Sequence, residues 1–216
     1  MQYDLVIFDW DGTLMNSAAK IISSMQQAAR ALSLPECSDE EIKNIIGLGL
    51  PEAILELYPQ QPADVRQHIR DQYAHFFVND HSVKSELFTG TLELLESLKS
   101  QGRTLAVATG KSRIGLNRIF DETGLGHYFA TSRCADETRS KPHPLMVMEI
   151  LEELKAPSHT AVVVGDTEYD LEMAASAGVA RIGVTYGSHS QDRLEKHGPI
   201  GCAQDVPELM QILQVK

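Results

Sequence analysis

Short runs of branched apolar residues recur along the chain, and stretches with a helical repeat of apolar positions separate them. Runs of this kind, bounded by polar residues or glycine, are typical of strands that are buried on both faces of a sheet. They predict strands at Leu5–Phe8, Thr104–Ala108, Ala161–Gly165 and Ala180–Val184. Helices are predicted at Thr91–Ser100, Ser112–Thr123, Pro144–Leu154, Glu168–Ala177 and Pro207–Leu213. This alternation predicts an α/β fold with a doubly wound, mostly parallel sheet.

The segment from residue 16 to residue 86 interrupts this alternation, because its patterns are helical. Ser38 and Glu41 have the spacing of a capping box, and Pro51 is a favourable first residue of a helix. Apolar side chains at helical spacing predict two further helices, with stripes at Ala18, Ile21, Ile22, Met25, Ala29 and Leu32 and at Val65, Ile69, Tyr73, Phe76 and Phe77. We therefore expect an α/β core of residues 1–15 and 87–216 and a helical domain of residues 16–86. The two crossings between them, near Met15–Asn16 and Glu86–Thr89, should lie together above the sheet.

Composition excludes several classes of protein. The 216 residues are 43% hydrophobic and 23% charged, which is ordinary for a globular protein, and the net charge of −11 argues against general nucleic-acid binding. No apolar run approaches the roughly 20 residues of a membrane helix, and the N-terminus lacks the pattern of a signal peptide. Three distant cysteines, Cys37, Cys134 and Cys202, suit reduced thiols in a cytosol. We expect a cytoplasmic monomer or weak homodimer without membrane or nucleic-acid partners.

Two carboxylates follow the first predicted strand, in the stretch Phe8-Asp9-Trp10-Asp11-Gly12-Thr13. Residues two apart in an extended chain point the same way, so Asp9 and Asp11 can face one point. Two like charges so close repel each other unless a cation or a shared proton lies between them. Ligands of parallel α/β sheets bind beyond the carboxyl ends of the strands, where this pair lies. The stretch therefore predicts a ligand site that involves a metal ion or a shared proton.

Further polar residues follow the other predicted strands. Thr109 and Gly110 end the strand that begins at Thr104, and Asp166 follows the strand that ends at Gly165. Lys141 lies in Ser140-Lys141-Pro142-His143-Pro144, just before a predicted helix. If these strands are neighbours, Asp9, Asp11, Thr109, Lys141 and Asp166 converge on one cleft.

These motifs resemble, in the same order, those of the haloacid dehalogenase superfamily of phosphohydrolases. The matching pieces are FDWDGTL, the strand-end Thr109, Lys141 in KPHP, and GDTEYDLEMAASAG, and the resemblance covers essentially the whole chain. The branch that is most similar is the phosphoglycolate-phosphatase-like one, in which a helical cap follows the first strand. Each motif alone is short, whereas four of them in order with the cap in place are specific. The resemblance implies a Mg²⁺-dependent phosphatase that hydrolyses a small phosphate monoester through an aspartyl-phosphate.

The resemblance also implies a role for each matching residue. Asp9 would attack phosphorus, and Asp11 would protonate the leaving oxygen and then take a proton from water. The Asp9 and Asp166 carboxylates, with the backbone carbonyl of Asp11, would hold Mg²⁺, which prefers such hard ligands. Lys141 would stabilise the phosphoryl group by its charge and Thr109 by its hydroxyl. Gly12 and Gly110 would let the backbone approach that group closely. Asp170 would orient Lys141 or a metal-bound water.

Several alternatives remain open at the level of sequence. The nearest is a sugar-phosphate mutase of the same superfamily, although mutases often carry valine at the position of Thr13. Retention of Asp11 disfavours dehalogenation, and the motif order and the helical insertion disfavour a phosphorylatable receiver domain. A non-catalytic phosphate-binding module is the last alternative, although every catalytic position is filled.

The substrate is not determined by these motifs. Gly47–Leu50 is a candidate selectivity loop by resemblance, and the helical segment offers the cations Lys43, Arg66, Arg70 and Lys84. Gly110 stands where the family commonly has asparagine, and Phe88-Thr89-Gly90 lacks a frequent proline. Lys111 is expected to be a solvated residue at the start of the next helix, with at most a minor role near the phosphate. Candidate substrates therefore range from 2-phosphoglycolate to sugar phosphates, nucleotides and pyrophosphate.

Overall fold

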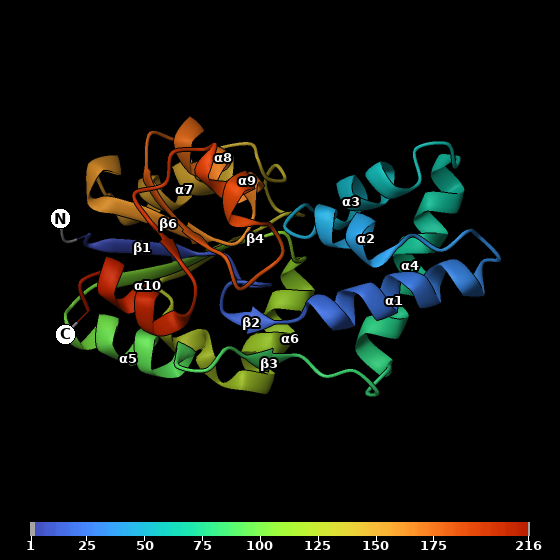
Figure 1. Cartoon of the computed structure of the whole chain (residues 1–216), viewed down its shortest axis with the longest axis horizontal. Helices are drawn as coiled ribbons and strands as arrows, with labels where there is room; N and C mark the ends of the chain where they lie inside the picture. The colour runs from blue at the N-terminus through green and yellow to red at the C-terminus, as the bar shows by residue number, and fades with distance from the viewer. Residues whose placement is uncertain (1–2, 216) are drawn as a thin grey trace.

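Six parallel strands form one sheet in the computed structural model, which describes residues 3–215 (Figure 1). The strand order is β5-β4-β1-β6-β7-β8. The strands are β1 (Leu5–Phe8), β4 (Thr104–Thr109), β5 (Thr131–Cys134), β6 (Ala161–Gly165), β7 (Ala180–Val184) and β8 (Cys202–Ala203). At the end of β1, Phe8 is paired with Val107 of β4 and Val164 of β6. The doubly wound α/β fold is confirmed, and the carboxyl ends of β1, β4 and β6 are adjacent.

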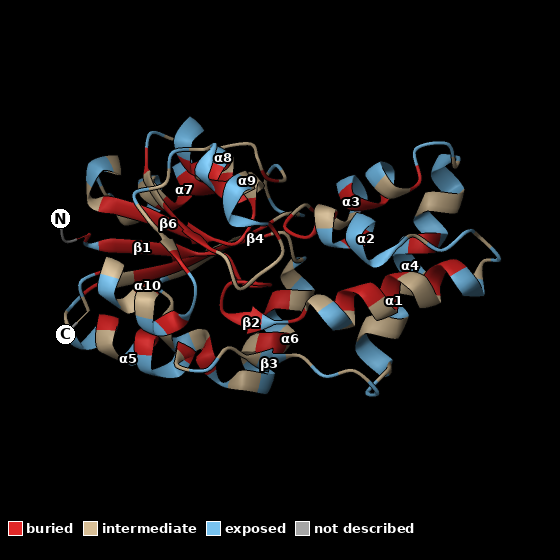
Figure 2. Cartoon of the chain, in the orientation of Figure 1, coloured by how far each residue is buried: buried red, intermediate tan, exposed pale blue. Residues whose placement is uncertain are grey.

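Helices cover both faces of this sheet because successive residues of each central strand point to opposite sides. Val6 and Phe8 pack with α5 (Thr91–Ser100), α6 (Arg113–Thr123) and α10 (Val206–Ile212). Leu5 and Ile7 pack on the other face with α7 (Leu145–Leu154) and α8 (Glu168–Ser176). The remaining short elements are η1 (Leu125–Tyr128), η2 (Ser158–Thr160) and α9 (Gln191–Glu195). Burial on both faces explains why the central strands are continuously apolar (Figure 2).

The two edge strands β5 and β8 were not predicted. β5 has the sequence Thr-Ser-Arg-Cys, and only Cys134 within it is fully buried. Arg133 of this strand forms ion pairs of 2.7 and 2.8 Å with Glu149 and Glu153 of α7. β8 is only two residues long. An edge strand needs no apolar run, because one side of it faces solvent, so the pattern that identifies central strands is missing here.

Residues 18–79 form four helices, here called the helical insert: α1 (Ala18–Ala31), α2 (Asp39–Ile45), α3 (Leu50–Leu57) and α4 (Ala63–Asn79). The insert has an apolar cluster of its own, which includes Met25, Ile42, Ile54 and Ile69. The predicted capping box is present, because Ser38 Oγ accepts a hydrogen bond from the Glu41 N–H while the Glu41 carboxylate accepts one from the Ser38 N–H.

The chain enters and leaves the region of the insert through a two-stranded antiparallel ribbon. It consists of β2 (Met15–Asn16) and β3 (Glu86–Leu87), in which Met15 is paired with Leu87. The prediction that the two crossings lie together is therefore confirmed, and Figure 1 shows β2 and β3 near each other.

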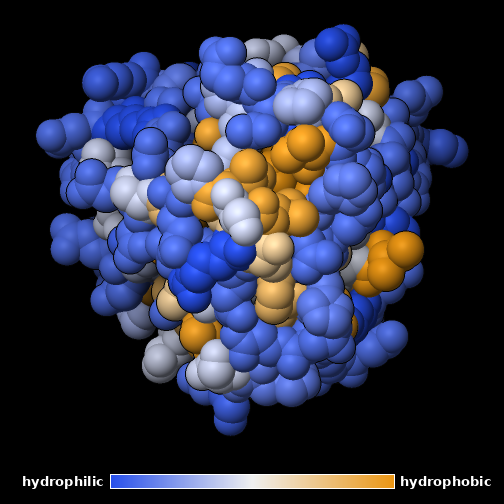
Figure 3. Space-filling view, turned by 90° about the vertical axis from the view of Figure 1, so that its right-hand side faces the viewer, coloured by the Kyte–Doolittle hydropathy of each residue, from blue (hydrophilic) through white to orange (hydrophobic). Residues whose placement is uncertain are grey.

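The end of the molecule that the insert forms is mostly hydrophilic. Figure 3 shows this face, on which apolar side chains gather in a strip framed by hydrophilic ones. Large apolar side chains of the insert that reach solvent include Leu55 and Val78. Within residues 3–215, no helix combines the length and the apolar character that crossing a membrane would require.

Candidate active site

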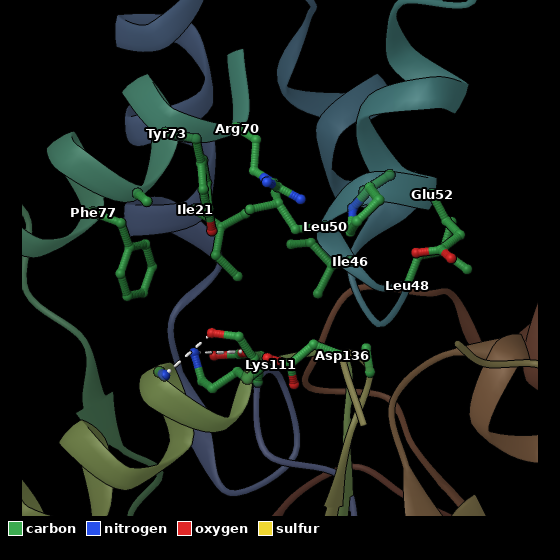
Figure 4. A pocket seen from close by; sticks show the side chains of 18 of the residues that line it. Ile21, Ile46, Leu48, Leu50, Glu52, Arg70, Tyr73, Phe77, Lys111 and Asp136 are labelled. Atoms are coloured by element: carbon green, nitrogen blue, oxygen red, sulfur yellow. Dashed lines mark hydrogen bonds and ion pairs between the residues drawn. The ribbon is translucent and has the colours of Figure 1, made fainter. Parts of the chain in front are cut away.

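The cleft at the carboxyl ends of β1 and β4 is a cavity of about 570 Å³ between the sheet and the helical insert. Asp9, Asp11 and Gly110 line its floor, together with Lys111, and side chains of α1, α3 and α4 line its roof (Figure 4). The predicted convergence of strand-end residues is thus observed for β1 and β4. Lys141 and Asp166 are buried next to Asp9.

A buried ion network fixes the position of Asp9. Lys141 Nζ lies 2.6 Å from Asp9 Oδ1 and 2.6 Å from Asp170 Oδ1, and the three side chains are at most 1% exposed. Asp170 Oδ2 accepts hydrogen bonds from the Thr167 hydroxyl at 2.6 Å and from the Thr167 N–H at 3.1 Å. Asp170 is therefore held at the start of α8, and through Lys141 it orients the carboxylate of Asp9.

The pKa values of these groups reflect three carboxyl groups buried around one lysine. Burial is the largest effect on Asp9 and raises its pKa well above the usual value, while Lys141 opposes this shift. Burial, followed by the charge of Asp170, raises the pKa of Asp166 to about 7, against hydrogen bonds from Ser188 and Thr13. Burial by itself lowers the pKa of Lys141, but Asp170 and Asp9 outweigh it and the pKa is raised. One lysine therefore does not balance the charge of these three carboxyl groups when all of them are ionised.

The donor set fits a divalent cation. Oxygen atoms of Asp9, Asp166 and Asp170 lie within 4.8 Å of one another. Asp9 Oδ2 is buried and has no hydrogen-bond partner within the described residues. Both oxygens of Asp170 are engaged by Lys141 and Thr167, and both oxygens of Asp166 accept hydrogen bonds, from Thr13 and Ser188, so Asp9 Oδ2 is the most available oxygen of the three side chains. Carboxylate oxygens without enough countercharge are the ligands that Mg²⁺ prefers.

Asp11 is turned away from this trio of carboxylates. Its Oδ1 accepts a hydrogen bond of 2.5 Å from the Ser17 hydroxyl, and its Oδ2 lies 2.9 Å from Lys111 Nζ. The expectation of a solvated Lys111 is wrong, because this side chain is only 12% exposed and α6 begins later, at Arg113. The position of Lys111 directly after the strand-end Thr109 and Gly110 was a signal that could have placed it in the cleft, whereas nothing in the sequence indicated Ser17.

Thr109 and the two predicted glycines lie at the strand ends, and of these three residues Gly110 lines the cavity, whereas Thr109 is fully buried. The Thr109 hydroxyl accepts a hydrogen bond of 3.2 Å from the Lys111 N–H. Gly12 has φ +78°, and a Cβ there would lie 2.1 Å from Asp166 Oδ2. A Cβ at Gly110 would lie 2.4 Å from the backbone oxygen of Leu48. Glycine at position 110, where the family commonly has asparagine, therefore allows the loop of the insert to approach this closely.

The insert touches the core next to the buried ion network. The Gly49 N–H donates a hydrogen bond of 2.7 Å to Ser140 Oγ, adjacent to Lys141. Three core side chains meet at Asn44 of α2: Tyr169 and His189 contact its backbone oxygen at 2.8 and 3.3 Å, and Arg193 contacts its side chain at 2.5 Å. The predicted selectivity loop Gly47–Leu50 therefore adjoins the site, while the contacts of Asn44 had no signal in the sequence.

A parallel sheet that brings carboxylates, a buried lysine and a hydroxyl to one cleft is suited to phosphoryl transfer, which depends on positioning and charge stabilisation. Residues 6–184 match the family described as haloacid dehalogenase-like hydrolase, and the chain belongs to this family. The receiver-domain alternative is thereby excluded.

Comparison with individual relatives shows to which members of this family the chain is similar. It is 38% identical over 200 residues to the probable phosphatase IndB of Dickeya dadantii, and this match covers 90% of this chain and 86% of the relative. It is 27% identical over 219 residues to phosphoglycolate phosphatase of Vibrio parahaemolyticus, and this match covers 98% of this chain and 96% of the relative. A crystal structure of a predicted phosphoglycolate phosphatase from Haemophilus somnus 129pt superimposes with a TM-score of 0.87 at 27% identity, covering 98% of both chains. The chain is thus a phosphatase of the phosphoglycolate-phosphatase-like branch, which confirms the predicted class.

Proposed function

We propose that this phosphatase is Mg²⁺-dependent and hydrolyses a small phosphate monoester, in the range from 2-phosphoglycolate to sugar phosphates, through an aspartyl-phosphate on Asp9. The observation that supports this most strongly is the state of Asp9: Oδ1 is fixed by Lys141, while Oδ2 is buried at the cavity without a partner among the described residues. A nucleophile held in one orientation with one free oxygen is what in-line attack on phosphorus requires.

The roles of the surrounding residues follow from their positions. Asp9 Oδ2 attacks phosphorus, and the bond from phosphorus to the alcohol oxygen of the substrate breaks. The Lys141 ammonium and the Thr109 hydroxyl stabilise the negative charge of the transferred phosphoryl group. Asp170 contacts Lys141 and therefore acts by positioning it. Gly12 and Gly110 keep the floor free of side chains that would collide with Asp166 and with the insert.

Asp11 supplies the proton that the alcohol needs to leave, and it later accepts a proton from the water that hydrolyses the aspartyl-phosphate. It lines the cavity, as a group that reaches the leaving oxygen must. Ser17 and Lys111 hold its two oxygens, so its orientation is fixed before substrate binds. In this scheme Lys111 is a second cation on the side of the leaving group, in addition to Lys141 beside the nucleophile.

Asp9, Asp166 and the backbone carbonyl of Asp11 would hold Mg²⁺. When bound, the cation offsets the repulsion between the carboxylates and the anionic phosphate. We further propose that residues 16–86 are a cap domain on a core of residues 1–15 and 87–216, and that the cap limits the access of water to the phosphoryl group. A cytoplasmic location and a monomeric or weakly dimeric state remain predictions.

The test is phosphate release from a panel of phosphate monoesters by the whole protein, before and after chelation of divalent cations, with Mg²⁺ added back. Asp9→Asn is expected to lower phosphate release at least about 10⁴-fold, because it removes the nucleophile. Asp121→Asn, at an exposed site on α6, is the matched control and should behave as the unchanged protein.

Metal-independent release, or an Asp9→Asn variant with undiminished activity, would contradict the mechanism. Transfer of phosphate between sugar phosphates without its release would indicate the mutase alternative. A rapid burst of product, equal to the enzyme concentration and absent in Asp9→Asn, would support the covalent intermediate.

A further inference from the structure

The roof of the active-site cavity is chemically unlike its floor. Apolar side chains from all four helices of the insert and the loop between α2 and α3 line it, among them Ile21, Met25, Ile46, Leu48, Tyr73 and Phe77. Figure 4 shows several of them pointing down towards Lys111. A substrate gains binding free energy when it covers such an apolar wall and removes it from water. The roof therefore favours a substrate with an apolar body.

The size of the cavity also indicates a substrate that is larger than 2-phosphoglycolate. Its volume of about 570 Å³ is within the range of pockets that enclose ligands of the size of drugs, roughly 300–1,000 Å³. 2-Phosphoglycolate has two carbon atoms and carries its charge at both ends. In this cavity its carboxylate would lie against a mostly apolar lining, and a carboxylate that gains no partner there pays a large desolvation penalty. A short acidic ester therefore matches neither the volume nor the lining.

Arg70 is the feature of the roof that can bind a polar group. Of the four cations predicted as candidates in the insert, Arg70 is the one that lines the cavity, whereas Arg66 donates a hydrogen bond to the backbone oxygen of Gln61. Figure 4 shows the Arg70 guanidinium pointing into the cavity from α4. Arg70 is an exposed residue, and within residues 3–215 it forms neither a hydrogen bond nor an ion pair that holds it elsewhere. Its donors are therefore available to a substrate.

The charges near Arg70 indicate what kind of acceptor it takes. Glu52 and Asp71 of the insert also line the cavity. A second anionic group on the substrate would be repelled by these carboxylates, whereas a neutral carbonyl oxygen would not. Tyr73 lies one turn further along α4 on the same face as Arg70, and its ring is 5.7 Å from that of Phe77. Aromatic side chains of this kind favour contact with a ring.

We infer that the substrate is a phosphate monoester with a neutral, ring-bearing body, and that a carbonyl-type oxygen at the end remote from the phosphate accepts hydrogen bonds from Arg70. This inference rests on the proposed phosphatase function and narrows its substrate class. In this arrangement the phosphate lies at Asp9, the ring packs against Tyr73 and the apolar roof, and Arg70 contacts the far end.

The experiment compares kcat/KM for ethyl phosphate, benzyl phosphate, 4-carbamoylbenzyl phosphate and 2-phosphoglycolate. The first three esters have similarly poor alkoxide leaving groups, so their ratios report on binding by the cavity. Benzyl phosphate is expected to exceed both ethyl phosphate and 2-phosphoglycolate at least about tenfold, because its ring fills the roof. The carbamoyl group is expected to add about fivefold more through Arg70.

Two variants separate the contributions. Arg70→Met should remove the advantage of the carbamoyl group and leave the ratio of benzyl to ethyl phosphate unchanged. Arg66→Met, on the same helix but outside the cavity, should leave both ratios unchanged. Tyr73→Ser should lower the ratio of benzyl to ethyl phosphate, and because both esters are measured on the same variant, a loss of folded protein does not affect the ratio.

A kcat/KM for 2-phosphoglycolate or ethyl phosphate that equals or exceeds the value for benzyl phosphate would overturn the inference. So would a carbamoyl advantage that persists in Arg70→Met. Acetyl phosphate distinguishes this failure from that of the proposed function. Enzymatic hydrolysis of acetyl phosphate, an acyl phosphate, without any preference among the four esters would contradict the inference alone. No enzymatic hydrolysis of acetyl phosphate or of any of the four esters would overturn both.

Discussion

The α/β core and the helical insert differ in where they place charge. The core buries Lys141, Asp9 and Asp170 in one network whose side chains are at most 1% exposed. The insert has an apolar interior, and an ion pair such as Arg30–Glu36 lies at its surface, with side chains that are 56% and 43% exposed. A buried ion network usually stabilises a protein no more than apolar residues of similar volume would, because the ions lose their hydration. Stability therefore does not explain why the core keeps these ions buried.

This difference separates two tasks. The core holds charges at fixed positions, and this is what phosphoryl transfer needs. The insert presents an apolar surface with one available cation, Arg70, to the same cavity. A change in the core should therefore affect the reaction with every substrate, whereas a change in the roof should affect the choice among substrates.

The largest expected effect is that of Lys141→Met. It leaves Asp9 and Asp170 buried without their countercharge, so we expect the free energy of unfolding to fall by about 3–5 kcal/mol. Phosphate release should fall at least about 100-fold for all esters, because a charge that stabilises the transferred group is lost. Denaturant unfolding and phosphate release measure the two effects.

The comparison variant in the insert is Arg30→Ala, which removes an exposed ion pair. Its effect on the free energy of unfolding should stay below about 1 kcal/mol, and the activity should not change. Equal destabilisation by Lys141→Met and Arg30→Ala would contradict the contrast between the buried and the exposed pair.

Truncation of one buried side chain in each region tests whether the insert unfolds by itself. Ile69→Ala in α4 and Leu95→Ala in α5 should each cost about 2–5 kcal/mol, because each leaves a cavity. Amide hydrogen exchange should then rise in α1–α4 alone for Ile69→Ala and throughout the chain for Leu95→Ala, if the insert is a separate cooperative unit. Faster exchange of the central strands in Ile69→Ala would show that insert and core unfold together.

A smaller effect is expected for Ser38→Ala. The change removes one half of the capping box at the start of α2, and loss of such a cap costs about 1 kcal/mol. Thermal unfolding measures the change, and Ser112→Ala at the start of α6 is the matched variant in the core, because Ser112 Oγ also accepts a hydrogen bond there. A loss of activity in Ser38→Ala without a loss of stability would contradict a purely structural role.

The smallest effect is a pH dependence at Asp80, where α4 ends. Hydrogen bonds from Ser82, followed by one from Gln27 of α1, lower the pKa of Asp80 to about 2, from an ordinary value of 3.8. Because the folded-state pKa is the lower one, the stabilisation is fully present above pH 3.8 and is lost as the pH falls towards 2. The difference in melting temperature between the unchanged protein and Asp80→Asn should therefore shrink over this interval. Asp121→Asn supplies the control for loss of one carboxylate.

Much of the fold was predictable because the signals are local. The central strands are apolar on both faces, so their runs identified them within one residue. The crossings predicted near Met15–Asn16 and Glu86–Thr89 do lie together. The edge strands β5 and β8 were missed because solvent on one side removes the apolar run. The convergence of Asp9 and Lys141 on one cleft was expected, whereas the Lys111–Asp11 pair was not.

The sequence by itself determined the alternation of strands and helices, the family, and the set of residues at the strand ends, since each of these is written in short stretches of neighbouring residues. Only the tertiary structure decided that Lys111 turns to Asp11, that Gly110 lies against the backbone of Leu48, and that Arg70 points into the cavity. Those contacts join residues distant in the chain, and they depend on how the insert is docked onto the sheet, which no local pattern of polar and apolar residues specifies.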